Sequence, residues 1–578
     1  MRILNVVKKW FDSQEHLCYL FILFFTIPNI ALCYTEPMSL IAKVCNIILP
    51  LAVYYTIFTS IKNCARTFLI LYPLLLLGVF QLVLLHIFGR SIIAVDMFLN
   101  MVTANPDEAI ELLDNLIPVL LLVAVIYIPL LAIAIHAYVR KRFLSDKFVK
   151  TSRKRSWKAL LAGIVSLLLA FIADSRYEIE SDLFPVNVFY NMAQAVERTN
   201  RTNRYEITSK NFTHDAVSTH LSDRKEVYVM VVGETSRAIN WSLYGYDRET
   251  NPNLSRQSGL SIFNKVLSEA NTTYKSVPML ISSVNAANFD SIYYRKSILT
   301  AFKEAGFQTA YFSNQRYNRS FIDFFGKEAD RFEFIKEQPS IYGVNPYDES
   351  LLKLVEEELK GTKSKQFILL HTYGSHFNYR ERYPSEKKYF TPDMPFDADV
   401  KYKDKLVNAY DNSIRYTDEF LSQLIELLKK QNIDAVMLYT SDHGEDLFDD
   451  KRLLFLHSSP TPTYYQLHVP LLLWMSDSYR SNYPQYQEIA RQNKDCNISS
   501  TTSFFHTMLE LAGLQTPYRN DSLSVVNTLF TERPRVYLDD HNKASSLDDA
   551  GLRKEDFRML QNKDISYLSP EKKKNRRK

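Results

Sequence analysis

The first third of the chain holds five long apolar segments, which constrain the fold more than any other feature of the sequence. They cover residues 17–34, 40–60, 67–88, 116–138 and 157–173. A helix needs about 20 mostly apolar residues to cross a bilayer. Buried helices of a soluble domain are the alternative, but five such stretches in succession favour membrane spans. No small-residue cleavage site follows the first segment, so we interpret it as a span and not as a signal peptide.

Basic residues around these segments predict how the chain is oriented. Short cytoplasmic loops are enriched in lysine and arginine. Lys8 and Lys9 precede the first segment, Lys62 and Arg66 lie between the second and third, and a basic loop at 140–155 lies between the fourth and fifth. All three places are therefore expected to be cytoplasmic. Because the number of spans is odd, the rest of the chain is expected on the outer side.

Two connecting regions have patterns of their own. The loop 89–115 between the third and fourth segments is acidic and long enough to carry a helix. Residues 174–225 form a polar bridge, in which 181–198 has a helical pattern with apolar residues near one side. This pattern suits an interfacial helix and a plain linker helix equally well.

From residue 226 the pattern changes to strands that alternate with helices. Strand-like runs recur at 227–232, 309–313, 367–371, 435–439, 470–475 and 535–538, with helical patterns at 294–305, 348–360, 402–430 and 501–512. Such alternation predicts a mostly parallel sheet with both faces covered. The expected parts are a transmembrane helical domain (1–173), the bridge (174–225), an α/β soluble domain (226–545) and a basic tail (546–578). The chain from Lys554 onward is expected to be disordered.

Charge and cysteine content exclude several kinds of site. The net charge is +5, but the densest basic clusters are the 140–155 loop and the C-terminus, so we expect no nucleic-acid partner. Four of the five cysteines lie in or beside the apolar segments, which leaves Cys496 alone in the soluble part. Neither a disulfide nor a cysteine-based zinc site can be built there.

Carboxylates and histidines directly follow three of the expected strands. Glu234 follows 227–232, His376 follows 367–371, and Asp442 with His443 follows 435–439. The carboxyl ends of parallel strands share one edge of the sheet, so these side chains are expected to converge. Each residue alone has a commoner structural role as a cap or a backbone hydrogen-bond partner. Together they predict a metal site, and glutamate, aspartate and histidine are ligands that suit zinc.

A hydroxyl or a water molecule is the expected nucleophile, because the soluble part has no cysteine available for the role. Residues 271–278 carry two neighbouring threonines, Thr272 and Thr273, ahead of a possible helix. A metal would make such a hydroxyl easier to deprotonate, as it lowers the pKa of water from 15.7 to about 7. The N-terminus of a helix would also stabilise phosphoryl oxygens. Of the histidines further on, His457 is a candidate for the site, and His468 is expected to be structural.

Seven motifs follow one another along the chain in a specific order. They are Gly233-Glu-Thr-Ser-Arg237, Asn240-Trp-Ser-Leu-Tyr-Gly-Tyr246, Ser276-Val-Pro278, Gly374-Ser-His376, Asn408-Ala-Tyr-Asp-Asn412, Ser441-Asp-His-Gly-Glu445 and Leu467-His-Val-Pro470. Together with the five spans they resemble the membrane-anchored phosphoethanolamine transferases of Gram-negative bacteria, whose soluble domain is alkaline phosphatase-like. The resemblance implies a multi-pass protein of the bacterial inner membrane with a periplasmic catalytic domain, which we expect to be a monomer.

The resemblance also implies a chemistry and a role for each site residue. Phosphoethanolamine would pass from phosphatidylethanolamine to a phosphothreonine and then to lipid A, the lipopolysaccharide core or another envelope glycan. Zn²⁺ would be bound by Glu234, Asp442 and His443 together with the nucleophile, which is Thr273 because it lies five residues before Pro278.

Four further residues have roles that the resemblance implies less directly. His376 and His457 would bind the phosphoryl group, a second zinc or the donor headgroup. Asn314 and Arg319 would lie near the substrate, where family members place an asparagine and a lysine. Arginine and lysine are not equivalent at a phosphate, so this substitution is a departure from the family pattern.

Two positions around the expected nucleophile also depart from the family pattern. Glu269 and Met279 stand where well-known members have two disulfide-bonded cysteines around the nucleophile, so rigidity at Thr273 is expected to come from packing.

A phosphoglycerol transferase of the lipoteichoic acid synthase type is the nearest alternative function. A sulfatase activity is disfavoured, because the Cys/Ser-x-Pro-x-Arg signature is absent. An inactive membrane scaffold is a further alternative, which the intact set of ligands disfavours.

Overall fold

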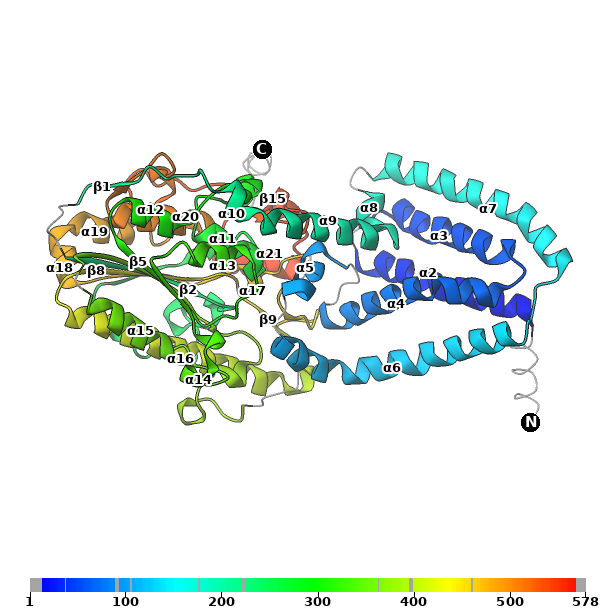
Figure 1. Ribbon diagram of the computed structural model, residues 1–578, viewed down its shortest axis with the longest axis horizontal. Coiled ribbons are helices and arrows are strands. Elements are labelled where there is room, and N and C mark those ends of the chain that lie inside the picture. Colours follow the sequence, from blue (N-terminus) through cyan, green and yellow to red (C-terminus); the bar gives the residue numbers. More distant parts are fainter. Residues whose placement is uncertain are drawn as a thin grey trace. The chain divides into compact units, whose positions relative to one another are not determined.

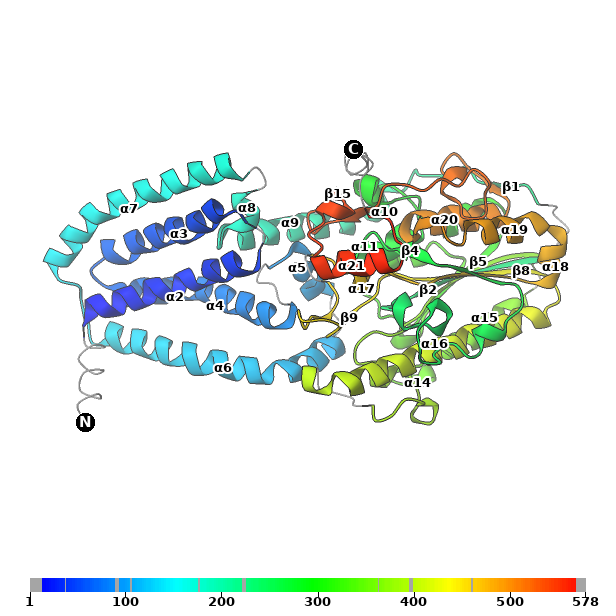
Figure 2. The ribbon, with the colours of Figure 1, turned by 180° about the vertical axis from the view of Figure 1, so that it is seen from behind.

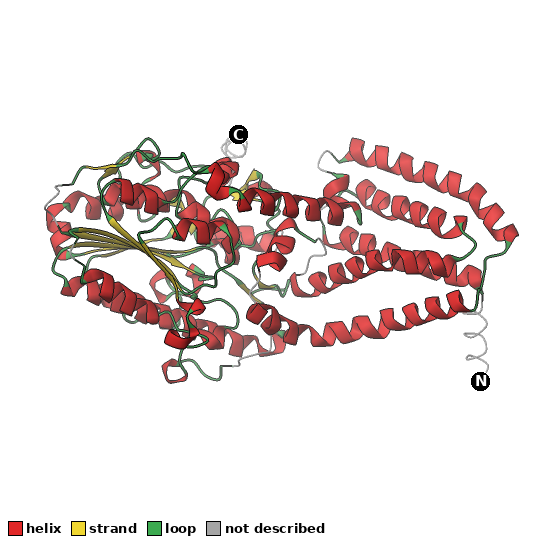
Figure 3. Ribbon diagram, in the orientation of Figure 1, coloured by secondary structure: helices red, strands yellow, loops and turns green. Residues whose placement is uncertain are grey.

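The structure is a computed structural model of the 578-residue chain. It describes residues 13–36, 38–88, 93–103, 106–174, 177–220, 225–361, 363–393, 399–458 and 461–567. The chain divides into two compact units. The first comprises Met1–Asn100 and Leu112–Glu197, and the second comprises Met101–Glu111 and Arg198–Lys578. Figure 3 shows helices in the first unit and a central sheet in the second.

Long apolar helices dominate the first unit. They are α2 (Gln14–Thr35), α3 (Leu40–Ser60), α4 (Cys64–Phe88), α6 (Pro106–Val139) and α7 (Asp146–Ala173). Within the described ranges, these five are long and apolar enough to cross a membrane, which confirms the five expected spans. A short helix, α5 (Val95–Thr103), lies in the acidic 89–115 segment, as expected.

Two helices begin earlier than the apolar pattern indicated. The helix α6 starts ten residues before the expected span 116–138, and α7 starts before the expected span 157–173. The basic residues from Lys147 to Arg155 therefore belong to the first turns of α7, and the prediction of a loop across 140–155 is wrong for this part. The side chain of Ser145 caps α7 by accepting a hydrogen bond from the backbone N–H of Phe148, which explains why the helix begins there.

Buried asparagines fix the bridge to the helices of the first unit. The Asn29 amide donates to the Phe184 carbonyl at 3.0 Å and accepts from the Phe184 N–H at 3.1 Å. The Asn46 amide donates to the Asp182 carbonyl at 2.6 Å. The helical pattern predicted for 181–198 forms two helices, α8 (Ile179–Asp182) and α9 (Val186–Asn203). Apolar side chains of α9, including Phe189, are exposed, and an interfacial role for this helix stays a prediction.

A seven-stranded sheet forms the centre of the second unit. Its order is β3 (Leu260–Phe263), β11 (Leu471–Met475), β8 (Asp434–Ser441), β2 (Glu226–Gly233), β7 (Lys365–His371), β5 (Gln308–Ser313) and β6 (Arg331–Phe334). The five strands from β8 to β6 are parallel, and β11 runs antiparallel to both of its neighbours. The mostly parallel sheet is therefore confirmed. The expected strand at 535–538 forms β14 (Val536–Leu538), which pairs with β15 (Ala544–Ser546) outside this sheet.

Alternate residues of the central strands belong to two separate cores, because successive side chains of a strand point to opposite faces. Tyr228 and Met230 of β2 belong to one core, whereas Val229 and Val231 belong to the other. The first core is covered by α11 (Thr273–Leu280), α12 (Ile298–Glu304) and α20 (Ser500–Leu511), and the second by α15 (Ser350–Leu359) and α16 (Lys403–Lys430) (Figure 1). Burial on both faces explains why the central strands are continuous apolar runs.

The end of the chain packs more tightly than the sequence suggested. Residues Lys554–Asn562 form α21, which lies beside α17 (Tyr464–Leu467) (Figure 2). Leu560 is buried, and the Asp556 carboxylate accepts hydrogen bonds from the Tyr464 N–H and from Arg452. The prediction of disorder from Lys554 onward is therefore wrong for 554–567. The helix is rich in charged residues, but one of its sides is apolar and packs against the domain. The basic stretch 568–578 lies outside the described residues.

The last residue of β2 provides a test of how closely the core is packed. A Cβ atom added at Gly233 would lie 2.6 Å from the hydroxyl oxygen and 2.8 Å from a ring carbon of Tyr439. We expect Gly233→Ala to lower the free energy of unfolding by about 1–3 kcal/mol, as overpacked cores do. The measurement is chemical denaturation of the purified protein.

A shorter side chain at position 439 serves as the control. In a Tyr439→Leu background the added methyl group has room, so Gly233→Ala should cost less there than in the wild type. Equal costs in both backgrounds would show that the clash with Tyr439 does not explain the glycine.

Candidate metal centre

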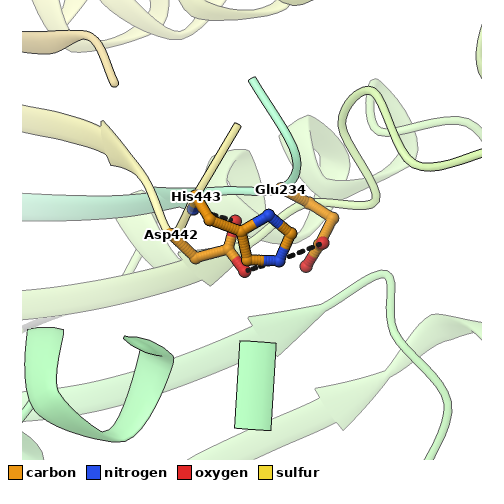
Figure 4. Close-up of side chains that lie close together, drawn as sticks. All are labelled: Glu234, Asp442 and His443. Carbon is orange, nitrogen blue, oxygen red and sulfur yellow. Dashed lines mark hydrogen bonds and ion pairs between the residues drawn. The ribbon is translucent and has the colours of Figure 1, made fainter. Parts of the chain in front are cut away.

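The register of two neighbouring parallel strands sets the position of the candidate site. Gly233, at the end of β2, pairs with Ser441, at the end of β8. Glu234 and the pair Asp442–His443 therefore leave the sheet side by side, and Figure 4 shows their side chains pointing toward one another. One ligand atom from each lies within 4.8 Å of the others, and all three side chains are buried.

Hydrogen bonds orient two of these side chains before any ligand is present. The Asp442 Oδ1 atom accepts from the backbone N–H groups of Thr235 at 3.0 Å and His443 at 2.7 Å. Its Oδ2 atom is buried and has no hydrogen-bond partner among the described residues. The His443 Nδ1–H donates to the Gly444 carbonyl at 2.9 Å, which leaves the Nε2 lone pair for a ligand. In metal sites, a hydrogen bond to the ring nitrogen that does not bind the metal fixes the orientation and the tautomer of a histidine ligand.

Glu234 lies in an environment that disfavours its charged form. Burial and then the nearby charge of Asp442 raise the pKa of Glu234 to about 7. The Thr235 hydroxyl donates to Glu234 Oε1 at 2.7 Å, and the Gln315 amide lies 3.4 Å from Oε2. A bound cation would offset the electrostatic cost of two neighbouring buried carboxylates.

The structure distinguishes the two candidate threonines. Thr273 is the first residue of α11, and its Oγ1 atom lies 3.2 Å from Glu234 Oε1 and 3.2 Å from His443 Nε2. The Thr272 hydroxyl is buried, and it has no hydrogen-bond partner in the described part of the chain. Thr273 also places the N-terminus of α11 beside this cluster, and the N-terminus of a helix can stabilise an anion.

The donor set fits a divalent metal. Glu234 and Asp442 offer carboxylate oxygens, His443 offers Nε2, and Thr273 offers a hydroxyl. Three protein ligands plus a fourth oxygen match the way that catalytic zinc is bound. The buried Asp442 Oδ2 atom is the specific sign: it makes no hydrogen bond within the described residues and lies 3.2 Å from His443 Nε2, and a cation would satisfy both atoms.

Two further histidines surround the cluster. The rings of His443 and His457 are 4.2 Å apart between centroids, and those of His376 and His457 are 5.7 Å apart. The His457 Nδ1 atom lies 3.3 Å from Glu445 Oε1. Burial and the two neighbouring histidines lower the pKa of His457 well below its usual value, so its ring is neutral. His376 stacks in parallel on Tyr373 at 5.4 Å. Both histidines expected at the site therefore lie around it.

The other two predicted substrate residues occupy different environments. Asn314 is buried, and its amide donates to the Pro346 carbonyl at 2.9 Å and to Asp348 at 2.8 Å. Asp348 in turn accepts from the backbone N–H groups of Tyr373 and Gly374. Asn314 thus supports the loop that carries His376, and contact with substrate stays a prediction. The side chain of Arg319 is exposed, and its role also stays a prediction.

His468 has the contacts expected of a structural residue. It is buried, its Nδ1 atom lies 2.7 Å from the Tyr464 hydroxyl, and its Nε2 atom lies 3.3 Å from the Asn264 carbonyl. Its backbone carbonyl accepts the N–H of Ala238 at 2.9 Å. These contacts tie β11 to the loop after β2.

The sequence patterns did not identify two residues that lie near Glu234. The Gln315 amide donates to the Thr372 carbonyl at 2.9 Å and lies near Glu234 Oε2. His371 lies with its Nε2 atom 3.9 Å from Glu234 Oε2. Both stand at the carboxyl ends of strands, β5 and β7, which is the signal that could have identified them. The sequence pattern places His371 only as the last residue of the expected strand 367–371.

Hydrogen bonds as well as packing hold the segment that carries Thr273. Met279 is fully buried in the core, as expected where a cysteine is replaced. Glu269 is also buried, and its carboxylate accepts from the Ala286 N–H at 3.1 Å and from the Thr502 hydroxyl at 2.9 Å. This carboxylate links the chain on both sides of α11 to α20, so the expectation of packing alone was incomplete.

Comparison with known families decides the class of the second unit. Residues 226–514, half of the chain, match the sulfatase family. The chain belongs to the sulfatase family. Its alkaline phosphatase-like fold, expected from the sequence motifs, is confirmed. This sequence lacks the Cys/Ser-x-Pro-x-Arg signature expected for sulfatase activity.

Individual relatives are phosphoethanolamine transferases. The chain is 28% identical to EptC from Escherichia coli K12 over 333 residues, which cover 55% of this chain and 56% of that protein. It is 31% identical to EptA from the same strain over 314 residues, which cover 53% and 56%. The chain thus matches about half the length of these relatives.

Two solved structures resemble different parts of the molecule. The zinc complex of the periplasmic domain of E. coli EptC aligns with a TM-score of 0.52 at 26% identity, covering 59% of this chain and 98% of that one. The integral membrane lipooligosaccharide phosphoethanolamine transferase A from Neisseria meningitidis aligns with a TM-score of 0.72 at 21% identity, covering 89% and 98%. The second match shows a shared fold that includes the membrane helices.

Substitution of single ligands should separate metal binding from stability. We expect Glu234→Gln and Asp442→Asn each to weaken zinc binding by more than about 100-fold, because outer partners of a ligand already change affinity 10–100-fold. Competition with a fluorescent chelator, using the full chain in detergent, measures this affinity.

Asp446→Asn is the matched control. Asp446 is buried close by in sequence, and burial raises its pKa to about 8, so an amide closely imitates its neutral form. This variant should bind zinc as the wild type does. A comparable loss in all three variants would contradict the assignment of Glu234 and Asp442 as ligands.

Proposed function

We propose that the protein is a zinc-dependent phosphoethanolamine transferase that uses Thr273 as its nucleophile. The observation that carries this proposal is the position of the Thr273 hydroxyl, 3.2 Å from both Glu234 Oε1 and His443 Nε2 at the N-terminus of α11. The relatives named phosphoethanolamine transferases support the choice of transferred group. The zinc complex of the EptC domain supports the choice of metal.

In the proposed first step, Thr273 accepts the phosphoryl group from phosphatidylethanolamine. Glu234, Asp442, His443 and the Thr273 hydroxyl would hold Zn²⁺, which when bound supplies positive charge that favours loss of the hydroxyl proton. The Thr273 Oγ1 atom then forms a bond to phosphorus, and the bond from phosphorus to the glycerol oxygen breaks. Diacylglycerol leaves with a proton on that oxygen, and phosphoethanolamine stays on Thr273.

Other residues would position the group in transfer. His457 lies next to His443, and His376 lies next to His457; we expect their rings to contact phosphoryl oxygens or the headgroup. Glu445 fixes the ring of His457 through Nδ1. The N–H groups of the first turn of α11 face the same anion. Positioning and charge neutralisation of this kind supply most of the catalysis in phosphoryl transfer.

In the proposed second step, the acceptor attacks the phosphothreonine. An oxygen of lipid A, of the lipopolysaccharide core or of another envelope glycan forms the new bond to phosphorus. The bond to Thr273 Oγ1 breaks, the acceptor oxygen loses its proton, and the hydroxyl is regenerated. A two-step transfer of this kind follows ping-pong kinetics.

The membrane helices support a location for this reaction. Five apolar helices followed by a soluble domain, with basic residues at the predicted cytoplasmic ends, favour a multi-pass protein whose second unit lies outside the cytoplasm. We propose the bacterial inner membrane and its periplasmic side, where both lipid substrates can be present, and a monomeric protein.

Exchange of the two neighbouring threonines tests the nucleophile. Thr273→Ala should abolish transfer, a loss of at least about 1,000-fold, because no covalent intermediate can form. Thr272→Val is the matched control, since the Thr272 hydroxyl makes no hydrogen bond within the described residues. The measurement is release of labelled diacylglycerol, with mass spectrometry for phosphoethanolamine on the 273 side chain. Full activity in Thr273→Ala would refute the assignment.

The choice of donor separates the proposed activity from phosphoglycerol transfer. Membranes that contain the protein should transfer label from headgroup-labelled phosphatidylethanolamine and not from phosphatidylglycerol. Mass spectrometry of envelope lipids and glycans, with and without the protein, should show added phosphoethanolamine and identify the acceptor. Transfer from phosphatidylglycerol alone would establish the alternative, and no transfer from either lipid by zinc-loaded protein would favour a scaffold.

A further inference from the structure

A buried histidine lies behind the metal ligand Glu234 with one ring nitrogen unused. His371 is the last residue of β7, where it pairs with Val232 of β2 on one side and with Ser313 of β5 on the other. Its Nε2 atom lies 3.9 Å from Glu234 Oε2, and both side chains are only 1% exposed. Within the part of the chain that the structure describes, this nitrogen has no hydrogen-bond partner.

The unused nitrogen needs an explanation, because buried polar atoms are almost always hydrogen-bonded. A hydrophobic residue of similar size would fill the end of β7 without leaving a polar atom unpaired. The acidic oxygen that lies close to His371 Nε2 is Glu234 Oε2. A separation of 3.9 Å is about 1 Å longer than an N–H···O hydrogen bond, a gap that small rotations of the two side chains would close.

The other ring nitrogen of His371 determines which tautomer is present. Its Nδ1 atom lies 3.4 Å from the Tyr311 hydroxyl. Burial raises the pKa of Tyr311, so its hydroxyl keeps its proton at neutral pH and is a donor available to Nδ1. Tyr311 can then donate to Nδ1, which places the ring proton on Nε2, on the side of Glu234.

Tight packing holds Tyr311 in place for this contact. A Cβ atom at Gly326 would lie 2.5 Å from two ring carbons of Tyr311, so only a glycine leaves room for the ring. Tyr311 and His371 come from neighbouring parallel strands, in which Ser313 pairs with His371. The tyrosine, the histidine and Glu234 therefore form a line across three strands at the carboxyl edge of the sheet.

The two oxygens of Glu234 have different neighbours. Oε1 accepts the Thr235 hydroxyl at 2.7 Å and lies 3.8 Å from His443 Nε2, on the side of the proposed metal. Oε2 has the Thr273 hydroxyl and the Gln315 amide at 3.4 Å, both long contacts, and His371 at 3.9 Å. A shorter hydrogen bond from His371 to Oε2 would fix the rotation of the carboxylate and keep Oε1 toward Asp442 and His443.

We propose that His371 is a positioning residue, whose Nε2–H holds Glu234 Oε2 while Tyr311 fixes the tautomer through Nδ1. Outer partners of this kind orient a ligand and raise its affinity for metal. This inference rests on the proposed metal site, but it concerns zinc affinity and is testable without an activity assay. His371 is thus assigned a role in metal binding without touching the metal or the substrate.

Zinc affinity of two variants tests the donor. His371→Leu removes Nε2 and should weaken zinc binding about 10–100-fold, as loss of an outer partner does. His371→Gln places an amide N–H₂ near the position of Nε2, and it should restore most of that loss. Chelator competition on the full chain in detergent gives both affinities, and thermal unfolding without zinc gives the stability of each variant.

His468→Leu is the matched control for the loss of a buried histidine. His468 is equally buried and also has a tyrosine hydroxyl on Nδ1, but its Nε2 atom contacts the Asn264 carbonyl, away from the three ligands. This variant should lose stability and keep wild-type zinc affinity. Equal zinc affinity in His371→Leu and the wild type, with the wild type binding zinc, would overturn the inference and leave the metal site intact.

A double-mutant cycle tests the tautomer. Tyr311→Phe should weaken zinc binding in the wild-type background and should have no effect once His371 is leucine, because the hydroxyl acts through the ring. If His371→Leu does not fold, Tyr311→Phe and His371→Gln decide: an unchanged affinity in Tyr311→Phe refutes the role of the tyrosine. If the wild-type protein binds no zinc, the proposed function itself fails, a different result from any of these.

Discussion

The pairing of β2 with β8 is the constraint on which the candidate site depends. Because Gly233 pairs with Ser441, the chain leaves both strands at the same level, and Glu234 emerges beside Asp442 and His443. The neighbouring strand β7 adds His371 directly and His376 through its loop. That loop approaches so closely that a Cβ at Gly374 would lie 2.6 Å from the Glu234 carbonyl oxygen. Three segments distant in sequence thus meet because one sheet aligns them.

Burial of like charges without a paired cation is what marks this edge as a site. Glu234 and Asp442 lie together below the surface, and burial with the neighbouring charge raises the pKa of Glu234 to about 7. Two other buried carboxylate–cation pairs in the second unit show the contrast: Arg237 lies 2.7 Å from Asp449, and Glu226 lies 3.0 Å from Lys365. The carboxylates at the sheet edge have neighbours suited to a bound cation and to a phosphoryl group.

The rigidity of the site comes from buried polar contacts. With all five cysteines unpaired, the second unit has no covalent cross-link. Glu269, which precedes the segment of Thr273, accepts hydrogen bonds from Ala286, which follows it, and from Thr502 of α20, and the amide of Asn271 donates to Gln466 at 2.7 Å. A network that is fully satisfied in a low-dielectric interior specifies one arrangement of its members. Small displacements would matter for the proposed phosphoryl transfer, because that reaction depends on positioning.

The sequence by itself determined the membrane spans, the alternation of strands and helices, and the three ligand candidates. Each is a local pattern: apolar length, period, or a carboxylate and histidine just after a strand. Only the tertiary structure decided that Thr273 contacts Glu234, that Asp442 Oδ2 is buried beside His443 Nε2 without a hydrogen bond, and that His371 and Gln315 lie near Glu234. These features depend on strand register and on side-chain rotation, which distant segments set through packing and which no local pattern records.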